Sequence, residues 1–314
     1  MRIDVHCHYY PDDYIALLES HGVDVAVTRG LGADGSDESM ARRFRLMDEA
    51  KVDLQILSPA SSQPYFDDAE TAVAAARLVN DRHAEAVKAH PSRFRAFASL
   101  PLPHPEAALE ELDRAMDGLG MVGVSITTSV LGRTLADPML EPIYAELDRR
   151  GATLFIHPAG CGIDSHMITD QRLEWLVGAP IEDLMALTHI LKSGVPLRYE
   201  RMNIIVPHLG GGLPFLMQRF DNSAAAGNTN WPAKPSDLAR RVWYDTVSWS
   251  QAAFRCTTDV IGADRLLFGT DFPYCSEAQY VSATNYYAGP ELTDAQRKAI
   301  DGGTAARLLG LDAI

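Results

Sequence analysis

The chain has 314 residues, of which 46% are hydrophobic and 22% are charged, a composition typical of a globular protein and not of a disordered one. Its formal net charge of −14 disfavours binding to nucleic acids or anionic membranes, which requires a basic surface. No apolar run approaches the length of about 18 residues expected of a transmembrane helix, and the chain starts on a predicted strand without a signal-peptide pattern. We therefore expect a cytoplasmic protein.

Short apolar segments alternate with amphipathic stretches along most of the chain. Each short segment is rich in Val, Ile, Leu or Phe and nearly continuous in hydrophobicity, as in strands covered on both faces. The stretches 68–89, 105–118 and 138–149 between them read as helices. This alternation predicts one (β/α)₈ TIM-type barrel domain over residues 1–314. The predicted strands are residues 3–8, 54–58, 94–100, 122–127, 153–157, 203–208, 242–247 and 266–270.

Two connections are longer than a barrel requires. Residues 23–37 carry Arg29, and residues 159–180 carry Trp175. Long loops after barrel strands lie at the C-terminal face, where active sites form, so we expect both loops to wall or cover a substrate. A third irregular stretch, residues 222–235, is expected to serve oligomer contacts.

The first predicted strand contains two histidines. His6 and His8 are two positions apart, so both imidazoles should face the barrel interior, whereas the intervening Cys7 should point to the opposite face. Cys7 is therefore a poor ligand candidate. The four cysteines form no C-x-x-C pair and read as reduced thiols. Taken alone, the histidine pair is explained as well by chance as by function.

Three more ligand-type residues fall at the carboxyl ends of predicted strands. His157 ends the fifth strand, His208 ends the sixth, and Asp271 follows the eighth. Catalytic groups of barrels converge at this end. Imidazole and carboxylate together suit Zn²⁺ or Mn²⁺ with one position left open. The fourth strand ends in GVSITTS and offers no Lys, Cys or Glu to bridge a second ion, so we expect a single metal.

The motifs DVHCHYYP, LFIHP, VPHLGGG and FGTDFP, in this order and spacing, resemble the amidohydrolase superfamily. More narrowly they resemble its decarboxylase branch, typified by 2-amino-3-carboxymuconate-6-semialdehyde decarboxylase. The resemblance extends to RLMDEAKVDLQILSP and EWLVGAPIED outside the metal site. Several aromatic-acid decarboxylases of the branch replace the first histidine by glutamate. The His-x-His kept here also resembles the hydrolases and hydratases of the branch, so this motif does not decide the reaction.

The resemblance implies a role for each of these residues. His6, His8, His157 and Asp271 are expected to hold one divalent ion, Zn²⁺ in first place and Mn²⁺ as the alternative. His208 is expected to be the catalytic acid or base, and Asp271 is expected to share in proton transfer.

Three residues match family positions on the substrate side. Arg29 matches an arginine that grips the substrate carboxylate, for which its planar fork is suited. Arg219 matches a residue contributed across a dimer interface, which implies a homodimer, and Trp175 matches an aromatic residue that lines the pocket. The structural alternatives are a solvated loop arginine, a helix-surface arginine and a simply buried tryptophan.

The sequence therefore predicts a metal-dependent, non-oxidative decarboxylase of a small aromatic or unsaturated carboxylic acid. The alternative is a metal-dependent hydrolase of a lactone or amide, or a hydratase, that uses the same His208 and Asp271. Release of CO₂ distinguishes the first reaction from ring opening with uptake of water. A third reading, an inactive metal-binding scaffold, is disfavoured because the ligand set and His208 are complete.

Overall fold

The computed structural model describes residues 1–275, 277–289 and 291–311. In these residues, eight parallel strands form a closed barrel. Single bridges from Ala98 to Val124 and from Cys7 to Phe272 join the edges of the two hydrogen-bonded sheets into one ring. The predicted barrel is thereby confirmed. Around the ring the strands are β1 (Ile3–His8), β2 (Leu54–Ser58), β3 (Phe94–Ala96), β4 (Val124–Thr127), β7 (Thr153–His157), β8 (Asn203–Val206), β9 (Trp243–Asp245) and β10 (Leu266–Leu267).

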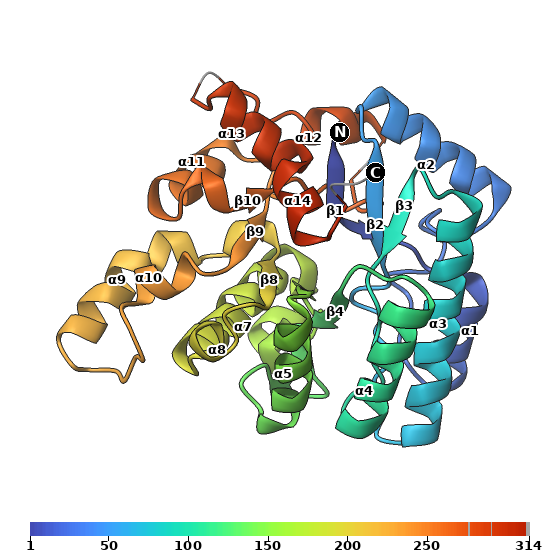
Figure 1. The fold of residues 1–314 in the computed structure, drawn as a ribbon, viewed down its shortest axis with the longest axis horizontal. Helices are drawn as coiled ribbons and strands as arrows, with labels where there is room; N and C mark the ends of the chain where they lie inside the picture. Colours follow the sequence, from blue (N-terminus) through green and yellow to red (C-terminus); the bar gives the residue numbers. More distant parts are fainter. Residues whose placement is uncertain (276, 290, 312–314) are drawn as a thin grey trace.

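Helices surround the strands, with α1 to α4 on one side of the barrel and α7 to α11 on the other (Figure 1). The helices are α1 (Asp12–Ser20), α2 (Asp37–Glu49), α3 (Ala69–Ala89), α4 (Pro105–Asp113), α5 (Glu141–Arg150), α6 (His166–Thr169), α7 (Ala179–Lys192), α8 (Val195–Arg198), α9 (Leu213–Ala225), α10 (Pro235–Ala239), α11 (Gln251–Val260), α12 (Glu277–Ala283), α13 (Asp294–Lys298) and α14 (Thr304–Leu308). A small antiparallel hairpin, β5 (Ser129–Val130) with β6 (Arg133–Thr134), follows β4.

The predicted helix bounds need small corrections that have local causes. The helix predicted for residues 68–89 begins one residue later, because the Asp68 side chain caps it by accepting the Thr71 N–H at 2.8 Å. The stretch 105–118 is α4 followed by a π-helical turn, and the stretch 138–149 begins as a 3₁₀ turn and ends at Arg150.

Several strands end earlier than predicted, and two or three residues beyond the end of β3 and of β10 a side chain replaces a backbone carbonyl as the acceptor of an N–H group. Ser99 N donates to the Asn80 side chain at 2.9 Å. Gly269 N donates to the Thr246 hydroxyl at 3.3 Å. After β8, Pro207 has no N–H to donate. The polypeptide thus leaves the ladder just where the site begins.

A β-bulge in β1 turns the two histidines inward. Asp4 and Cys7 pair with residues only two apart on β2, so β1 carries one extra residue between them. Before the bulge, Val5 packs inside the barrel. After it, the rings of His6 and His8 lie inside and contact each other with their centroids 5.3 Å apart. Simple alternation along β1 would have placed Val5 and His6 on opposite faces with Val5 outside.

The interior of the barrel is apolar on the side of the histidines that faces away from Asp271, and α14 covers this end of the barrel. Inward side chains of the strands pack there against α14 and the residues that follow it. This inner cluster consists of Ile3, Val5, Leu54, Ile56, Ala60, Phe97, Phe155, Ile205, Trp243, Leu267, Ala305, Ala306, Leu308, Leu309 and Leu311. A larger cluster packs the outer face of the strands against the helices.

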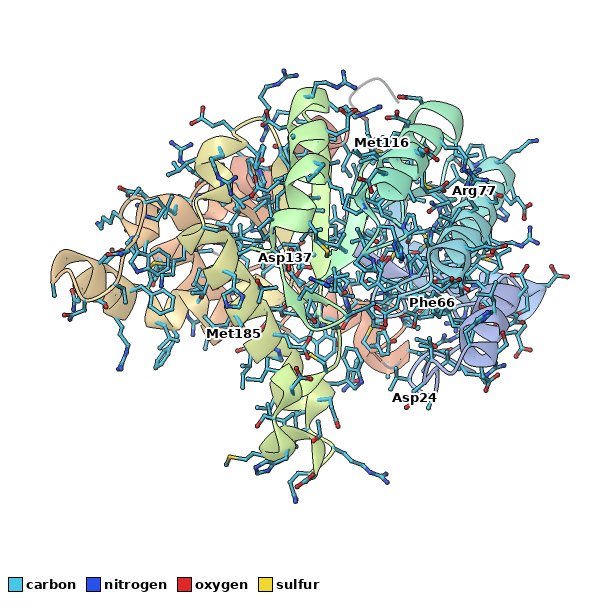
Figure 2. All side chains as sticks on the ribbon, turned by 90° about the horizontal axis from the view of Figure 1, so that it is seen from below. Asp24, Phe66, Arg77, Met116, Asp137 and Met185 are labelled. Atoms are coloured by element: carbon cyan, nitrogen blue, oxygen red, sulfur yellow. The ribbon has the colours of Figure 1, made fainter. Side chains whose placement is uncertain are left out.

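The long connections contain more structure than the sequence indicated. Residues 159–180 include the turns Gly162–Asp164 and Glu174–Gly178 with α6 between them. Figure 2 shows this segment standing out from the barrel beside Met185 on α7. The irregular stretch predicted at 222–235 starts within α9, which extends to Ala225. All four cysteines are free thiols. Among the helices of the described residues, none combines the length and apolarity needed to cross a bilayer.

Candidate metal centre

The structure brings together the four residues expected to bind metal. His6, His8, His157 and Asp271 each offer one ligand atom, and these atoms all lie within 4.8 Å of one another. The Nε2 atoms of His6 and His8 lie 3.1 Å and 2.9 Å from the same Asp271 oxygen. The three imidazoles are buried, and the Asp271 side chain is 15% exposed. The cluster therefore lies at the floor of an opening.

Hydrogen bonds to the Nδ1 atoms of two imidazoles leave their Nε2 atoms free to bind a cation. The Nδ1 atom of His6 lies 2.6 Å from the Asp245 carboxylate, and the Nδ1 atom of His157 lies 2.9 Å from the Pro158 carbonyl. These acceptors hold a proton on each Nδ1, so Nε2 is the atom that can bind a cation. No contact with good hydrogen-bond geometry reaches the buried Nε2 of His6 among the described residues, although an Asp271 oxygen lies 3.1 Å away. This donor set fits a divalent ion.

Burial and charge together set the protonation of the cluster. Burial lowers the pKa of His8 to about 4 and that of His157 well below its usual value, so both rings are neutral, as ligands must be. Burial also opposes the charge on His6, but the carboxylates of Asp245 and Asp271 outweigh it and raise the pKa of His6 to about 9. A proton on His6 thus balances carboxylate charge that a bound cation would balance instead.

His208 faces the same opening but is held by other contacts. It follows Pro207 at the end of β8 in the left-handed conformation, with a φ of 52°. Its Nδ1 lies 2.8 Å from Asp183, and its Nε2 lies 3.8 Å from Asp271. Burial opposes protonation of the ring, but the Asp183 carboxylate outweighs it and raises the pKa of His208 well above its usual value. The geometry suits a proton donor better than a fifth ligand.

Aromatic side chains wall the opening above the cluster. Two adjoining cavities of about 500 Å³ and about 260 Å³ share Trp175, Trp249, His208 and Asp271 among their lining residues. Trp175 stacks on Tyr274, which lines the smaller cavity, with ring centroids 6.5 Å apart and planes 18° apart. Trp175 lines both cavities, and its contact with substrate stays a prediction.

The two arginines expected to contact substrate do not reach these cavities. Arg29 is exposed and forms an ion pair with Glu19 on the surface. Arg219 is exposed on α9 and forms no ion pair with a described residue. Among the residues that the structure describes, no lysine and no arginine lines either cavity. In the structure Glu19, and not a group of either cavity, faces the guanidinium of Arg29, and a contact of Arg29 with substrate stays a prediction.

Sequence reasoning missed several residues that shape this site. Asp183 and Asp245 are fully buried carboxylates, each hydrogen-bonded to a site histidine. Trp249 and Tyr274 line the smaller cavity. A signal was present for Asp245, because an aspartate inside the apolar strand WYDTV is rare unless it has a buried partner.

Comparison with known proteins agrees with the motifs. A 2-amino-3-carboxymuconate-6-semialdehyde decarboxylase of Dictyostelium discoideum is 27% identical over 99% of this chain and 92% of its own. A γ-resorcylate decarboxylase of a Rhizobium species is 30% identical over 97% of this chain and 93% of its own. A manganese-bound dihydroxybenzoic acid decarboxylase of Polaromonas sp. JS666 has a TM-score of 0.84 at 27% identity, covering 100% of this chain and 98% of its own. The family model described as amidohydrolase matches residues 3–311, and the chain therefore belongs to the amidohydrolase family.

Proposed function

We propose that this chain is a metal-dependent, non-oxidative decarboxylase of a small aromatic carboxylic acid. The observation that carries the proposal is the placement of His208 beside a complete ligand cluster that includes Asp271, at the floor of a cavity with aromatic walls. The relatives named above are decarboxylases, and two of them act on hydroxybenzoic acids by name. Both the chemistry of the site and the relatives therefore favour release of CO₂.

We propose one divalent ion held by His6, His8, His157 and Asp271. When bound, the ion supplies Lewis-acid stabilisation of negative charge on a substrate oxygen. Imidazole and carboxylate ligands accept both Zn²⁺ and Mn²⁺. The Polaromonas relative holds manganese, so Mn²⁺ is tested beside the Zn²⁺ that the motifs suggested.

In the proposed reaction, His208 and Asp271 transfer the proton that replaces CO₂. The bond between the ring carbon and the carboxylate breaks, its electron pair stays on the ring carbon, and a proton takes the place of CO₂. His208 can supply that proton because Asp183 favours its protonated ring and its Nε2 faces the cavity. Asp271, 3.8 Å from that nitrogen, can accept or pass on the proton.

The cavity walls favour a planar ring over a flexible chain. Trp175, Trp249 and Tyr274 offer aromatic faces against which a flat substrate can stack. Because the described lining has no arginine or lysine, a second carboxylate on the substrate would find no cation from the same chain. We therefore propose an aromatic acid in preference to an open-chain acid, and a second carboxylate would need a cation from a neighbouring copy.

We propose a homodimer in which Arg219 reaches the cavity of the neighbouring copy. Arg219 lies one helical turn after Phe215 on α9, so both share a face of that helix. Phe215 is 83% exposed and also lines the larger cavity, and nearby Leu176 is 75% exposed. An apolar rim of this kind favours burial against another chain.

The four free thiols support the cytoplasmic location expected from the sequence.

The decisive experiment loads the purified protein with Mn²⁺ or Zn²⁺ and incubates it with hydroxybenzoates labelled with ¹³C at the carboxyl group. Carboxymuconate semialdehydes and lactones are assayed in parallel. We expect labelled CO₂ from a hydroxybenzoate, and none from metal-free protein. Opening of a lactone with uptake of water, without CO₂ from any acid, would make the chain a hydrolase and overturn the proposal.

A further inference from the structure

The buried carboxylate of Asp245 contacts both halves of the site. One oxygen lies 2.6 Å from Nδ1 of His6. The other oxygen accepts the backbone N–H groups of His208 at 2.8 Å and of Val247 at 3.0 Å. Asp245 is 0% exposed, so these contacts are not shared with bulk water. A single side chain on β9 therefore joins a proposed metal ligand to the proposed proton donor.

Each contact has a separate consequence. The carboxylate holds a proton on Nδ1 of His6 and thereby leaves Nε2 for the ion. The N–H contact fixes the backbone of His208, whose positive φ is a conformation that residues with a Cβ seldom adopt unless their surroundings impose it. Without this anchor the backbone of His208 could shift, and the imidazole would be held only by its contact with Asp183.

We propose that Asp245 is a positioning residue that sets metal affinity through His6 and proton transfer through the backbone of His208. The inference rests on the proposed function, because it requires an ion at His6 and a proton transfer at His208. The proposal predicts that a change at only one oxygen of Asp245 alters metal affinity without altering proton transfer.

The substitution Asp245→Asn makes that separation. Two N–H groups point at one oxygen of Asp245, so the carbonyl of the asparagine amide must take that place and its NH₂ must face His6. The NH₂ group then donates to Nδ1 of His6, which moves the imidazole proton to Nε2, the atom needed for the ion. The backbone anchor of His208 stays intact. The substitution Asp245→Ala removes both contacts.

Metal affinity is measured first, by competition of Mn²⁺ or Zn²⁺ with a chelator and without substrate, and turnover is then measured at saturating metal. For D245N we expect the metal Kd to rise about 10- to 100-fold, with kcat at saturating metal within about threefold of wild type. For D245A we expect the same loss of affinity and, in addition, a fall in kcat at saturating metal of about tenfold or more.

Two control variants separate positioning from loss of charge. D183N removes a carboxylate that contacts His208 but no proposed ligand, so its metal Kd should stay near that of wild type. E111Q changes a buried carboxylate paired with Arg114 on the outer helices, and it should alter neither quantity.

The proposal is overturned if D245N binds metal like wild type, if D183N weakens binding as much as D245N, or if D245A and D245N share one kcat. D245N keeps both backbone hydrogen bonds, so its affinity remains a test even where D245A does not fold. Wild-type protein that binds Mn²⁺ but releases no CO₂ contradicts the proposed function only, because the affinity comparison uses no substrate.

Discussion

Asp183 on α7 holds the imidazole of His208 from behind. The Nδ1 atom of His208 and the Asp183 oxygen are 2.8 Å apart, although the two residues are 25 positions apart in the chain. Asp183 is fully buried, so its charge acts on His208 with little screening by water. The pair lets the opposite nitrogen of the ring, which faces the cavity, carry and deliver a proton.

Replacement of Asp183 by asparagine should therefore slow turnover while leaving the metal in place. The amide has no charge to stabilise protonated His208, so we expect kcat to fall about 10²- to 10⁴-fold. The measurement is steady-state turnover of the metal-loaded variant together with metal content by elemental analysis. Unchanged kcat would show that the pair with Asp183 does not serve proton transfer.

His208 and His157 should differ when each is replaced by alanine. H208A should keep one metal per chain and lose about 10²-fold or more in kcat, because only the proton donor is removed. H157A should lose metal, because it removes one of the four clustered donors. Metal content after gel filtration and kcat measured for both variants check this. Loss of metal from H208A would make His208 a ligand and reverse its assigned role.

Removal of the metal should lower the stability of the fold as well as activity. An ion that binds only the folded state at 100 times its Kd stabilises it by about 2.7 kcal/mol. Thermal unfolding with EDTA, and again after addition of Mn²⁺ or Zn²⁺, measures the difference. H157A is the matched control, and its unfolding temperature should not respond to the added ion. An equal response from H157A would place the stabilising ion elsewhere.

The ring of Trp175 lies close to Gly160, and this contact offers a test of the cavity wall. A Cβ at Gly160 would come within 2.4 Å of the Trp175 ring, so G160A should displace the ring and lower kcat/KM for the acid about tenfold. Gly120 also has a positive φ but meets nothing within 4 Å. G120A therefore carries the same backbone strain without moving the ring, and its kcat/KM should stay near that of wild type. Equal kcat/KM values for G160A and wild type would remove Trp175 from the substrate wall.

The order of strands and the convergence of the ligands could be predicted, because both follow from local patterns. Apolar runs mark strands, and the ends of parallel strands meet at one face. The bulge in β1 could not be predicted, because an extra residue in a strand depends on its pairing with β2 and leaves no periodic signal. His6 and His8 were placed correctly by alternation, although Val5 shows that the alternation is broken just before them.

The contacts of Asp245, Asp183 and Arg29 were beyond sequence reasoning for a related reason. Each depends on which side chain comes near in three dimensions. Asp245 forms a hydrogen bond with His6, which lies 239 positions away in the chain. Glu19 forms an ion pair with Arg29, which lies only 10 positions away. Residue types indicated the chemistry of the site, but the partners that orient each group depend on tertiary packing.

His83 should make stability depend on pH between about 6.5 and 4. This histidine of α3 is fully buried and donates from Nε2 to the Tyr9 carbonyl at 3.1 Å, and burial lowers its pKa to about 4. The unfolded chain takes up a proton at this residue near pH 6.5 and the folded chain only near pH 4. The unfolded state therefore binds more protons in this window, and stability falls as the pH falls, by about 3 kcal/mol at pH 4.

The variant H83Q removes the titrating group and keeps a donor for Tyr9, so its stability should change less over the same range. Urea unfolding at pH 7 and pH 4.5, in EDTA so that loss of metal does not contribute, gives the two free energies of unfolding for each protein. The exposed His166 serves as the control, and H166Q should show the same dependence on pH as wild type. If H83Q kept the full dependence, the acid sensitivity would have to come from other groups, of which the carboxylate–histidine contacts around His6 are the next to test.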